Sequence, residues 1–509
     1  MPRRVVRWSV IAISSFVLTL TLATAVLLRP ARIKALTVAG LTGHLALDVS
    51  VESISVSFLP RPRITGANLA LRLPDHPELP PFIHIRNFWM DAGVLSILRK
   101  HVGTIYLDGL TIAVPPGNAR AGLPGGGGSS AMSDVIVDHI VAHNAVLMFV
   151  PRTPDRTPLT FDIHDLTVDA VGFGREMPFT TRLTNPVPKG VINAHGTVGP
   201  WVKDNATAFP LAGEYTFTDA DLSTINGIGG TLSSTGKFNG RVTAIGVVGQ
   251  ADVPDFSLDL GGQPIALSTS FEAEVDGTDG TTSLTRVDAR MANSPMRVSG
   301  AITNLAGPAG RQVDLDVQIT EGRIEDLIAL AIESPQPLMI GDVALTAKLS
   351  LPPGPSRVRE RLTLAGTFGL SSTRFTDRDV QAKLQELSRR SQGKDQDDPM
   401  ARVLTSLRGR FTLAGGALAL QNLSFRVPGA AISLAGTYSL ASSAMDFRGT
   451  LRMTASVSQA VGGVKSIFLR PFDALFRKDG AGAVVPIKIT GTRTAPKFGL
   501  EIGKVFGRN

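Results

Sequence analysis

The chain has 509 residues, 43% of them hydrophobic, which is enough apolar sequence to bury a large core. It contains no cysteine, which excludes disulfides, thiolate metal sites and a cysteine nucleophile. The net charge is +8, but six cations precede the first acid, Asp48, so the remaining chain carries only +2. With 6% aromatic residues and no basic run interleaved with rings, the sequence argues against nucleic acid as a partner.

The first predicted element is the apolar segment Trp8–Leu28, which has 21 residues without a charge. This length is sufficient to cross a bilayer as a helix. A cleaved signal peptide is the alternative, favoured by the triplet Ala23, Thr24 and Ala25, but that triplet lies inside an apolar run that is long for a signal. Three cations flank each side, so charge bias does not choose the orientation. We predict a retained anchor, a short cytoplasmic tail of residues 1–7, and export of the rest.

Residues 29–120 are predicted to hold a helix from about Ala31 to Gly43 and then a first β segment. In IYLDGLTI the alternation of a strand slips by one residue, because the apolar residue after Leu107 is Leu110. A bulge at Asp108 and Gly109 would absorb the extra residue and keep Leu107 and Leu110 on one face. The same slip recurs at Val51 to Ile54, Ile85 to Phe88, Val137 to Ile140, Ile163 to Leu166 and Leu420 to Leu423.

The segment 121–133 is rich in glycine and serine and is predicted to be a flexible loop. Residues 134–509 read as mainly β, with ribbons such as PIALSTSFEAEV in which apolar and polar residues alternate. Few helices interrupt these strands. We expect short ones at Val94–Lys100, from Arg323 in GRIEDLIALA, and in DVQAKLQELSRR, with Asp379 as the N-cap.

No motif in the sequence nominates a catalytic centre, a cofactor or a metal. His139 and His143 have the spacing of a helical zinc pair, but their surroundings are typical of a strand, which would place them about 13 Å apart. GGVKS at Gly462 lacks the glycine that a phosphate-binding loop has directly before its lysine. Asp276 and Asp279 in VDGTDGT are better explained by a tight hairpin turn than by calcium. We therefore predict a protein that is not an enzyme.

A basic amphipathic stretch, VGGVKSIFLRPFDALFRK, lies near the C-terminus and is interrupted by Pro471. Such a stretch fits either a membrane surface or a helical cap packed on the end of the sheet. The candidate membrane-surface residues are Lys465, Phe468, Arg470, Phe472, Phe476 and Arg477.

A sheet with one apolar face must cover that face with another sheet, with helices or with an apolar ligand. Helices are too few here, and strands that bend repeatedly favour a long antiparallel sheet curled into a groove; a nested β-sandwich is the alternative. The candidate lining residues of the groove are Ile105, Leu107, Leu110, Ile112, Ile265, Leu267, Phe271, Val275, Val313, Leu315, Val317 and Ile487.

The order of these features resembles the AsmA family, bacterial envelope proteins related in architecture to bridge-like lipid-transfer proteins. The resemblance runs from the anchor through SFLPRPRITGANLALRL and VPDFSLDLGGQPIALSTSFEAEVDGTDG to GRFTLAGGALALQNLSFRVPGAAISLAGTYSL and VVPIKITGTRTAPKFGL, with the AsmA-like C-terminal region at about 400–509. It implies an inner-membrane anchor, a β-rich periplasmic groove, and a role in moving phospholipid toward the outer membrane or keeping that membrane in order. It implies no catalytic residues.

Two other classes of function stay open on the sequence. An assembly factor for outer-membrane proteins or envelope complexes would have the same β-rich body with its apolar faces sealed in a sandwich. A hydrolase of envelope polymers would need paired carboxylates or an activated nucleophile in a cleft.

Overall fold

The computed structural model describes residues 48–57, 63–91, 101–116, 136–151, 158–172, 174–200, 210–225, 227–259, 262–277, 280–304, 310–376, 378–392, 405–455, 483–492 and 495–500. Five predicted segments lie outside these ranges: the anchor Trp8–Leu28, the helices at 31–43 and 94–100, the loop 121–133 and the amphipathic stretch 461–478. Within the described ranges, no helix has the length and apolar character needed to span a membrane.

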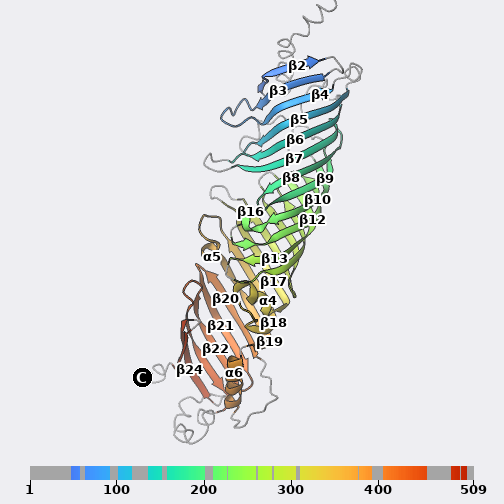
Figure 1. The fold of residues 1–509 in the computed structure, drawn as a ribbon. Helices are drawn as coiled ribbons and strands as arrows, with labels where there is room; N and C mark the ends of the chain where they lie inside the picture. The colour runs from blue at the N-terminus through green and yellow to red at the C-terminus, as the bar shows by residue number, and fades with distance from the viewer. Residues whose placement is uncertain are drawn as a thin grey trace, which may run out of the picture. The chain divides into compact units, whose positions relative to one another are not determined.

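The described chain is mainly β, as predicted (Figure 1). It divides into two compact units, residues 1–218 with 235–245 and residues 219–234 with 246–509. The strands that lie wholly or mostly in unit 1 are β1 (Asp48–Ser50), β2 (Ser53–Ser57), β3 (Arg63–Arg72), β4 (Ile83–Asp91), β5 (His101–Val114), β6 (Ile136–Phe149), β7 (Leu159–Val171), β8 (Met177–Pro186), β9 (Lys189–Val198), β10 (Pro210–Asp221) and β12 (Thr231–Arg241).

Neighbouring strands of unit 1 pair in chain order, with β3 also pairing with both β1 and β2. The sheet is antiparallel, as predicted, except that β5 and β6 pair parallel. His101 and Ile136, the first residues of these strands, are register partners. Parallel neighbours of this kind cannot be joined by a tight hairpin turn.

The slip at Asp108 and Gly109 is confirmed as a backbone irregularity. Gly109 has a φ of +68°. Gly109 and Arg86, which lies opposite it on β4, are not paired in the register of the two strands. Asn68 in β3 and Asn144 in β6 take the same left-handed conformation, with φ of +49° and +52°. These irregularities lie side by side across neighbouring strands, so one line of irregular positions crosses the sheet. The predicted bulge with an extra residue is wrong, because the register of β4 with β5 is the same on both sides of Gly109 and the two strands slip together.

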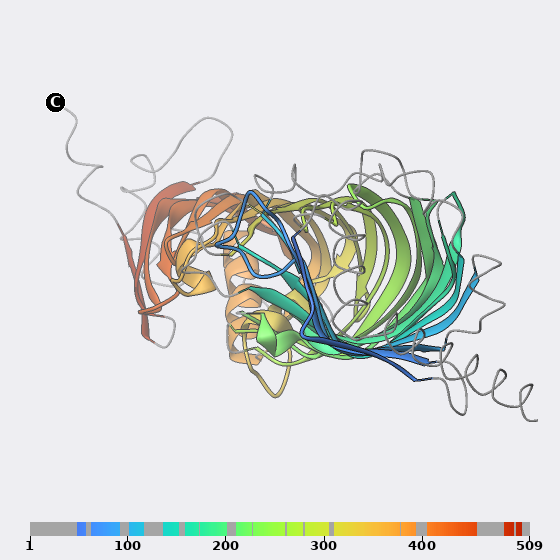
Figure 2. The same cartoon turned by 90° about the horizontal axis from the view of Figure 1, so that it is seen from above.

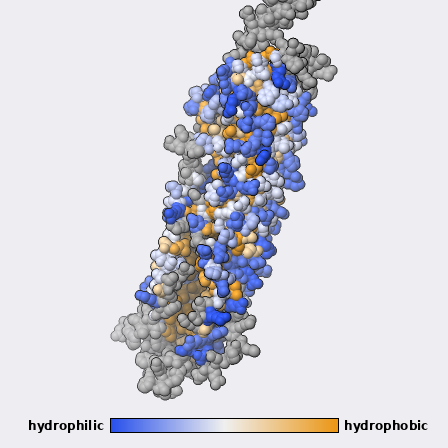
Figure 3. All heavy atoms as spheres, in the orientation of Figure 1, coloured by the Kyte–Doolittle hydropathy of each residue, from blue (hydrophilic) through white to orange (hydrophobic). Residues whose placement is uncertain are grey.

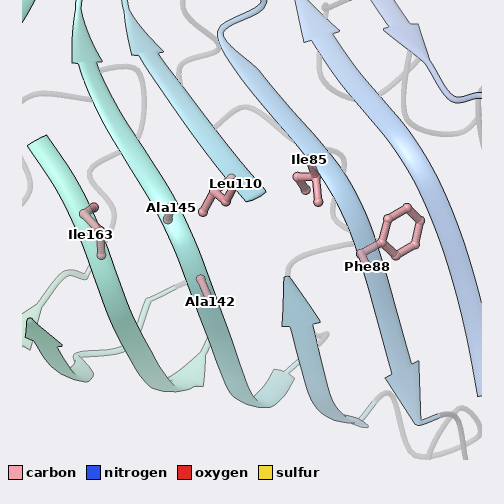
Figure 4. Close-up of a cluster of buried hydrophobic side chains, with 6 residues drawn as sticks. All are labelled: Ile85, Phe88, Leu110, Ala142, Ala145 and Ile163. Atoms are coloured by element: carbon pink, nitrogen blue, oxygen red, sulfur yellow. The ribbon is translucent and has the colours of Figure 1, made fainter. Parts of the chain in front are cut away.

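The irregular positions keep the apolar side chains on one face, as the sequence predicts. Leu110 belongs to the buried cluster of unit 1, and Leu107 packs against that cluster (Figure 4). Residues on both sides of the slips in β4 and β7 are joined in this cluster too. Its buried members are Ile85, Phe88, Leu110, Ala142, Ala145 and Ile163.

Unit 2 contains the remaining strands, of which β14 to β25 each pair antiparallel with the next. Figure 2 shows that these strands bend along their length. They are β11 (Ile228–Gly229), β13 (Ala244–Leu258), β14 (Ile265–Val275), β15 (Thr282–Met291), β16 (Ser294–Thr303), β17 (Gln312–Arg323), β18 (Met339–Leu351), β19 (Thr363–Phe375), β20 (Thr405–Ala414), β21 (Ala417–Val427), β22 (Ala430–Ser439), β23 (Ala444–Met453), β24 (Ala483–Thr492) and β25 (Ala495–Leu500).

Two predicted helices of unit 2 are confirmed, α4 (Ile324–Ala331) and α6 (Arg378–Ser391). The assignment of Asp379 as an N-cap is wrong, because Arg378 is already helical and places Asp379 in the first turn. A four-residue helix, α5 (Val358–Arg361), and a 3-10 turn, η2 (Leu222–Thr224), were not predicted. The hairpin at Asp276 is confirmed in its described part, since Asp276 N–H donates to Thr281 O at 2.8 Å.

Candidate functional site

The register of unit 2 places its predicted lining residues on one face, called here the inner face. Residues directly opposite each other in an antiparallel pair point to the same side of a sheet, so a row of register partners marks one face. One such row crosses eleven strands, from Phe271 in β14 to Ile489 in β24. Its members are Phe271, Val287, Val298, Val317, Ala347, Gly366, Phe411, Leu420, Gly436, Phe447 and Ile489.

The inner face carries no charge along this row, nor along a second row parallel to it. The second row consists of Ala273, Leu284, Gly300, Leu315, Leu349, Leu364, Leu413, Leu418, Tyr438, Met445 and Gly491. The other predicted residues of unit 2 lie an even number of positions from a row member on the same strand. They therefore share its face. These are Ile265, Leu267, Val275, Val313 and Ile487.

The opposite or outer face of unit 2 holds the charges. Asp288 on β15 bonds to Arg286 at 2.6 Å and to Arg297 at 3.1 Å. Lys348 and Asp316 form a further ion pair at 3.1 Å. The hydrogen bond from Arg297 is the largest cause that holds the pKa of Asp288 below its ordinary value. The two faces of this sheet thus differ completely in polarity.

Unit 1 has the same two-faced construction. A row of register partners runs without a charge from β2 to β9, and Ile105 belongs to it. The members are Val56, Ile64, Met90, Ile105, Ile140, Val168, Phe179 and Gly196. Leu107, Leu110 and Ile112 lie on the same face, as their contacts with the buried cluster of unit 1 require.

The predicted lining residues are apolar but incompletely covered. Of the twelve, only Leu110 is buried, at 7% exposure, and the other eleven are half-buried. In β14 every second side chain from Ile265 to Val275 is half-buried, and those between are exposed. Figure 3 shows hydrophobic residues gathered in a hollowed strip over the region that holds β20–β22 in Figure 1.

The prediction missed much of the inner face, especially in β18 to β23. Phe368 and Phe411, whose ring centroids are 6.2 Å apart, and Phe447 belong to it. Their strands alternate as regularly as β14, so the period of two could have identified them. The glycines in the two rows do not stand out as apolar positions in an alternating pattern. The Cβ that a substitution at Gly436 would add lies 2.6 Å from Phe447 Cδ1, so the ring covers the glycine.

Helix α4 is fixed at one margin of unit 2 by buried polar groups. Asp326, 7% exposed, accepts hydrogen bonds from Asn293 N–H at 3.0 Å and Ser294 Oγ at 2.8 Å. Ser294 Oγ in turn accepts from Arg323 N–H at 2.8 Å. The backbone of α4 also accepts at Ala329 O from Gln263 N–H at 2.7 Å. The carboxylate therefore ties the helix to the β15–β16 turn.

Two polar hollows lie on the outer face, one in each unit. The hollow of unit 1, about 610 Å³, includes Arg182, His195, Glu214 and Lys237 in its lining. Lys237 donates to Glu214 at 2.8 Å, and this hydrogen bond lowers the pKa of Glu214 and raises that of Lys237. The hollow of unit 2, about 500 Å³, includes Asp288.

The histidine pair lies on a strand, as predicted, and not on a helix. His139 and His143 are in β6, and each bonds an aspartate of β7, Asp169 at 2.7 Å and Asp165 at 2.8 Å. Within the described ranges, no three side chains of the metal-binding types come together as a possible site. The predicted membrane-surface residues, Lys465 to Arg477, fall outside those ranges.

Compared with known proteins, the chain matches no family model and no curated protein.

Proposed function

We propose that the chain is a conduit that carries phospholipid along the inner face of its curled sheet. The observation that carries this proposal is the charge-free inner face of half-buried apolar side chains. The resemblance to the AsmA family suggests the same role. We further propose that Trp8–Leu28 anchors the chain in a bacterial inner membrane, that the β region occupies the periplasm, and that lipid moves toward the outer membrane.

The physical basis of this function is the cost of exposing acyl chains to water. At about 0.8 kcal/mol per CH₂, exposing a 16-carbon chain costs roughly 12 kcal/mol. An apolar groove removes most of that barrier and leaves the headgroup in water along the open side. Transport of this kind needs neither a catalytic group nor a cofactor.

The exposure of the inner face favours a groove over a nested sandwich. In a sandwich, the side chains between two packed sheets would form a closed core about 10 Å thick. Phe271, Val317 and Ile487 are half-buried, which leaves part of each surface for a ligand. An assembly factor with sealed apolar faces is the alternative.

A photoreactive side chain on each face of one strand tests the proposal in the full chain. We expect benzophenylalanine at Leu267 to form an adduct with phospholipid in cells after illumination, detected by mass spectrometry of the protein. The same residue at Ser268, the exposed neighbour, is the matched control and should give little adduct. Equal labelling from the two faces would reject the conduit in favour of the sealed assembly factor. So would the absence of any adduct from benzophenylalanine at Leu267 and, in a second variant, at Val317.

A further inference from the structure

Two loops from opposite margins of unit 2 meet at one place. Strand β18 begins at Met339, after α4, and ends at Leu351, before α5. At about 3.3 Å per residue, its 13 residues would separate these two helices by roughly 40 Å if the strand were straight. The helices therefore mark the two margins, the α4 margin and the α5 margin.

One short piece of chain reaches both margins. On the α4 side, Gln263 N–H donates to Ala329 O at 2.7 Å, and Asp259 N–H donates to Gly227 O at 3.0 Å. Residues 259 and 263 are separated by at most about 14 Å of extended chain. On the α5 side, Gly227 lies against Val358, because a Cβ built on Gly227 would be 2.9 Å from Val358 Cγ2. The loops of the two margins therefore meet at Gly227 and Val358.

Both loops are shaped by their own hydrogen bonds before they meet. In the η2 loop, Asp221 accepts from Ser223 N–H at 2.9 Å, and Leu222 N–H donates to Gly230 O at 2.9 Å. In the α5 loop, Arg361 donates to Ser356 O at 2.8 Å and also to Pro352 O. The contact of Val358 with Gly227 is apolar.

We propose that Gly227 and Val358 form a strap across the groove, and that a lipid headgroup passes this point only when the contact opens. The inference rests on the proposed function, because it concerns lipid moving along the inner face. Acyl chains can slide beneath the strap on the apolar face. The headgroup remains in water along the open side, since burying its charges would be costly, so it meets the strap directly.

A reversible cross-link tests the strap. The chain has no cysteine, so Gly227→Cys with Val358→Cys introduces the only thiols. A Cβ built on Gly227 lies 3.0 Å from Val358 Cβ, so the loops must shift to reach the 3.5 to 4.5 Å of a disulfide. Gly227 has a φ of +94°, and the Gly227→Cys single variant controls for the strain of a side chain there. The full-length double variant is reconstituted in phosphatidylcholine vesicles, and transfer of a fluorescent phospholipid to acceptor vesicles is measured with and without reductant. Each single variant is the control.

We expect oxidation to lower the transfer rate at least tenfold and reductant to restore it, with no such change in the single variants. Equal rates in the two states would overturn the strap while leaving the conduit intact. Absence of transfer by the unmodified chain would instead refute the conduit and the strap with it. If only the double variant fails to transfer lipid, the strap is tested instead by comparing phospholipids of different headgroup size. The unmodified chain should transfer phosphatidylinositol more slowly than phosphatidic acid, and Val358→Ala should reduce that difference; an unchanged ratio rejects the strap.

Discussion

The strongest test of an open inner face is a charge placed on it. Phe271 is half-buried at the centre of the β14 alternation, with exposed Ser270 beside it. Fully burying a phenylalanine contributes about 1.5 to 3 kcal/mol, so the half-buried ring of Phe271 contributes roughly 1 to 2 kcal/mol. In an open groove the new carboxylate of Phe271→Asp stays in water. The expected loss of stability is therefore about 1 to 2 kcal/mol.

A sealed core predicts a different magnitude for the same change. Removal of a core phenylalanine costs about 3 to 5 kcal/mol, and an unpaired buried carboxylate adds several more. Phe411 lies in the same row and is 8% exposed, so Phe411→Asp serves as the reference for a buried site. Ser270→Asp adds the same charge on the outer face and should change stability by less than about 0.5 kcal/mol.

The assay is urea unfolding followed by circular dichroism, with hydrogen exchange of the peptides that contain β14 to β16 as a local measure. Exchange is informative because a chain of this size need not unfold in one step. We expect Phe271→Asp to lose about 1 to 2 kcal/mol, more than Ser270→Asp but well short of Phe411→Asp, and to lose the phospholipid adduct from Leu267 while folded. A loss as large as that of Phe411→Asp would refute the open groove.

Three further predictions test how the sheets are held together. Gly66→Ala should destabilise unit 1 by about 1 to 3 kcal/mol, because its Cβ would lie 2.3 Å from Phe88 Cζ. Gly369→Ala is the control, because its Cβ meets nothing within 4 Å. Equal effects of the two changes in thermal unfolding would contradict the argument. Asp326→Ala should cost about 2 to 3 kcal/mol, because it leaves Asn293 N–H and Ser294 Oγ without their acceptor, and should speed hydrogen exchange in α4; unchanged exchange would count against the anchoring role. The hydrogen bond from Asn144 lowers the pKa of Asp108. This carboxylate therefore stabilises the fold at pH values above its ordinary pKa and loses that contribution as the pH falls through its folded pKa. NMR titration should show the pKa of Asp108 rising in Asn144→Ala, and an unchanged pKa would exclude that cause.

The local features of the fold were predictable from the sequence. Alternation identified β14, and the slip at Asp108 and Gly109 identified the irregular position in β5. These predictions succeed because side-chain direction in a strand depends only on nearest neighbours along the chain. The irregular positions also follow local chemistry, since glycine and asparagine accept the left-handed conformation most readily.

The pairing of distant segments was decided only in three dimensions. The parallel partnership of β5 with β6, the glycines covered by rings and the α4 anchor at Asp326 join residues far apart in sequence. No local pattern encodes such contacts, because they depend on the register between strands and on how far the sheet curls. The sequence by itself determined that each strand has one apolar and one polar face. The tertiary structure decided that these faces align into continuous charge-free rows and that Gly227 meets Val358, because both results need the summed twist and bending of many strands.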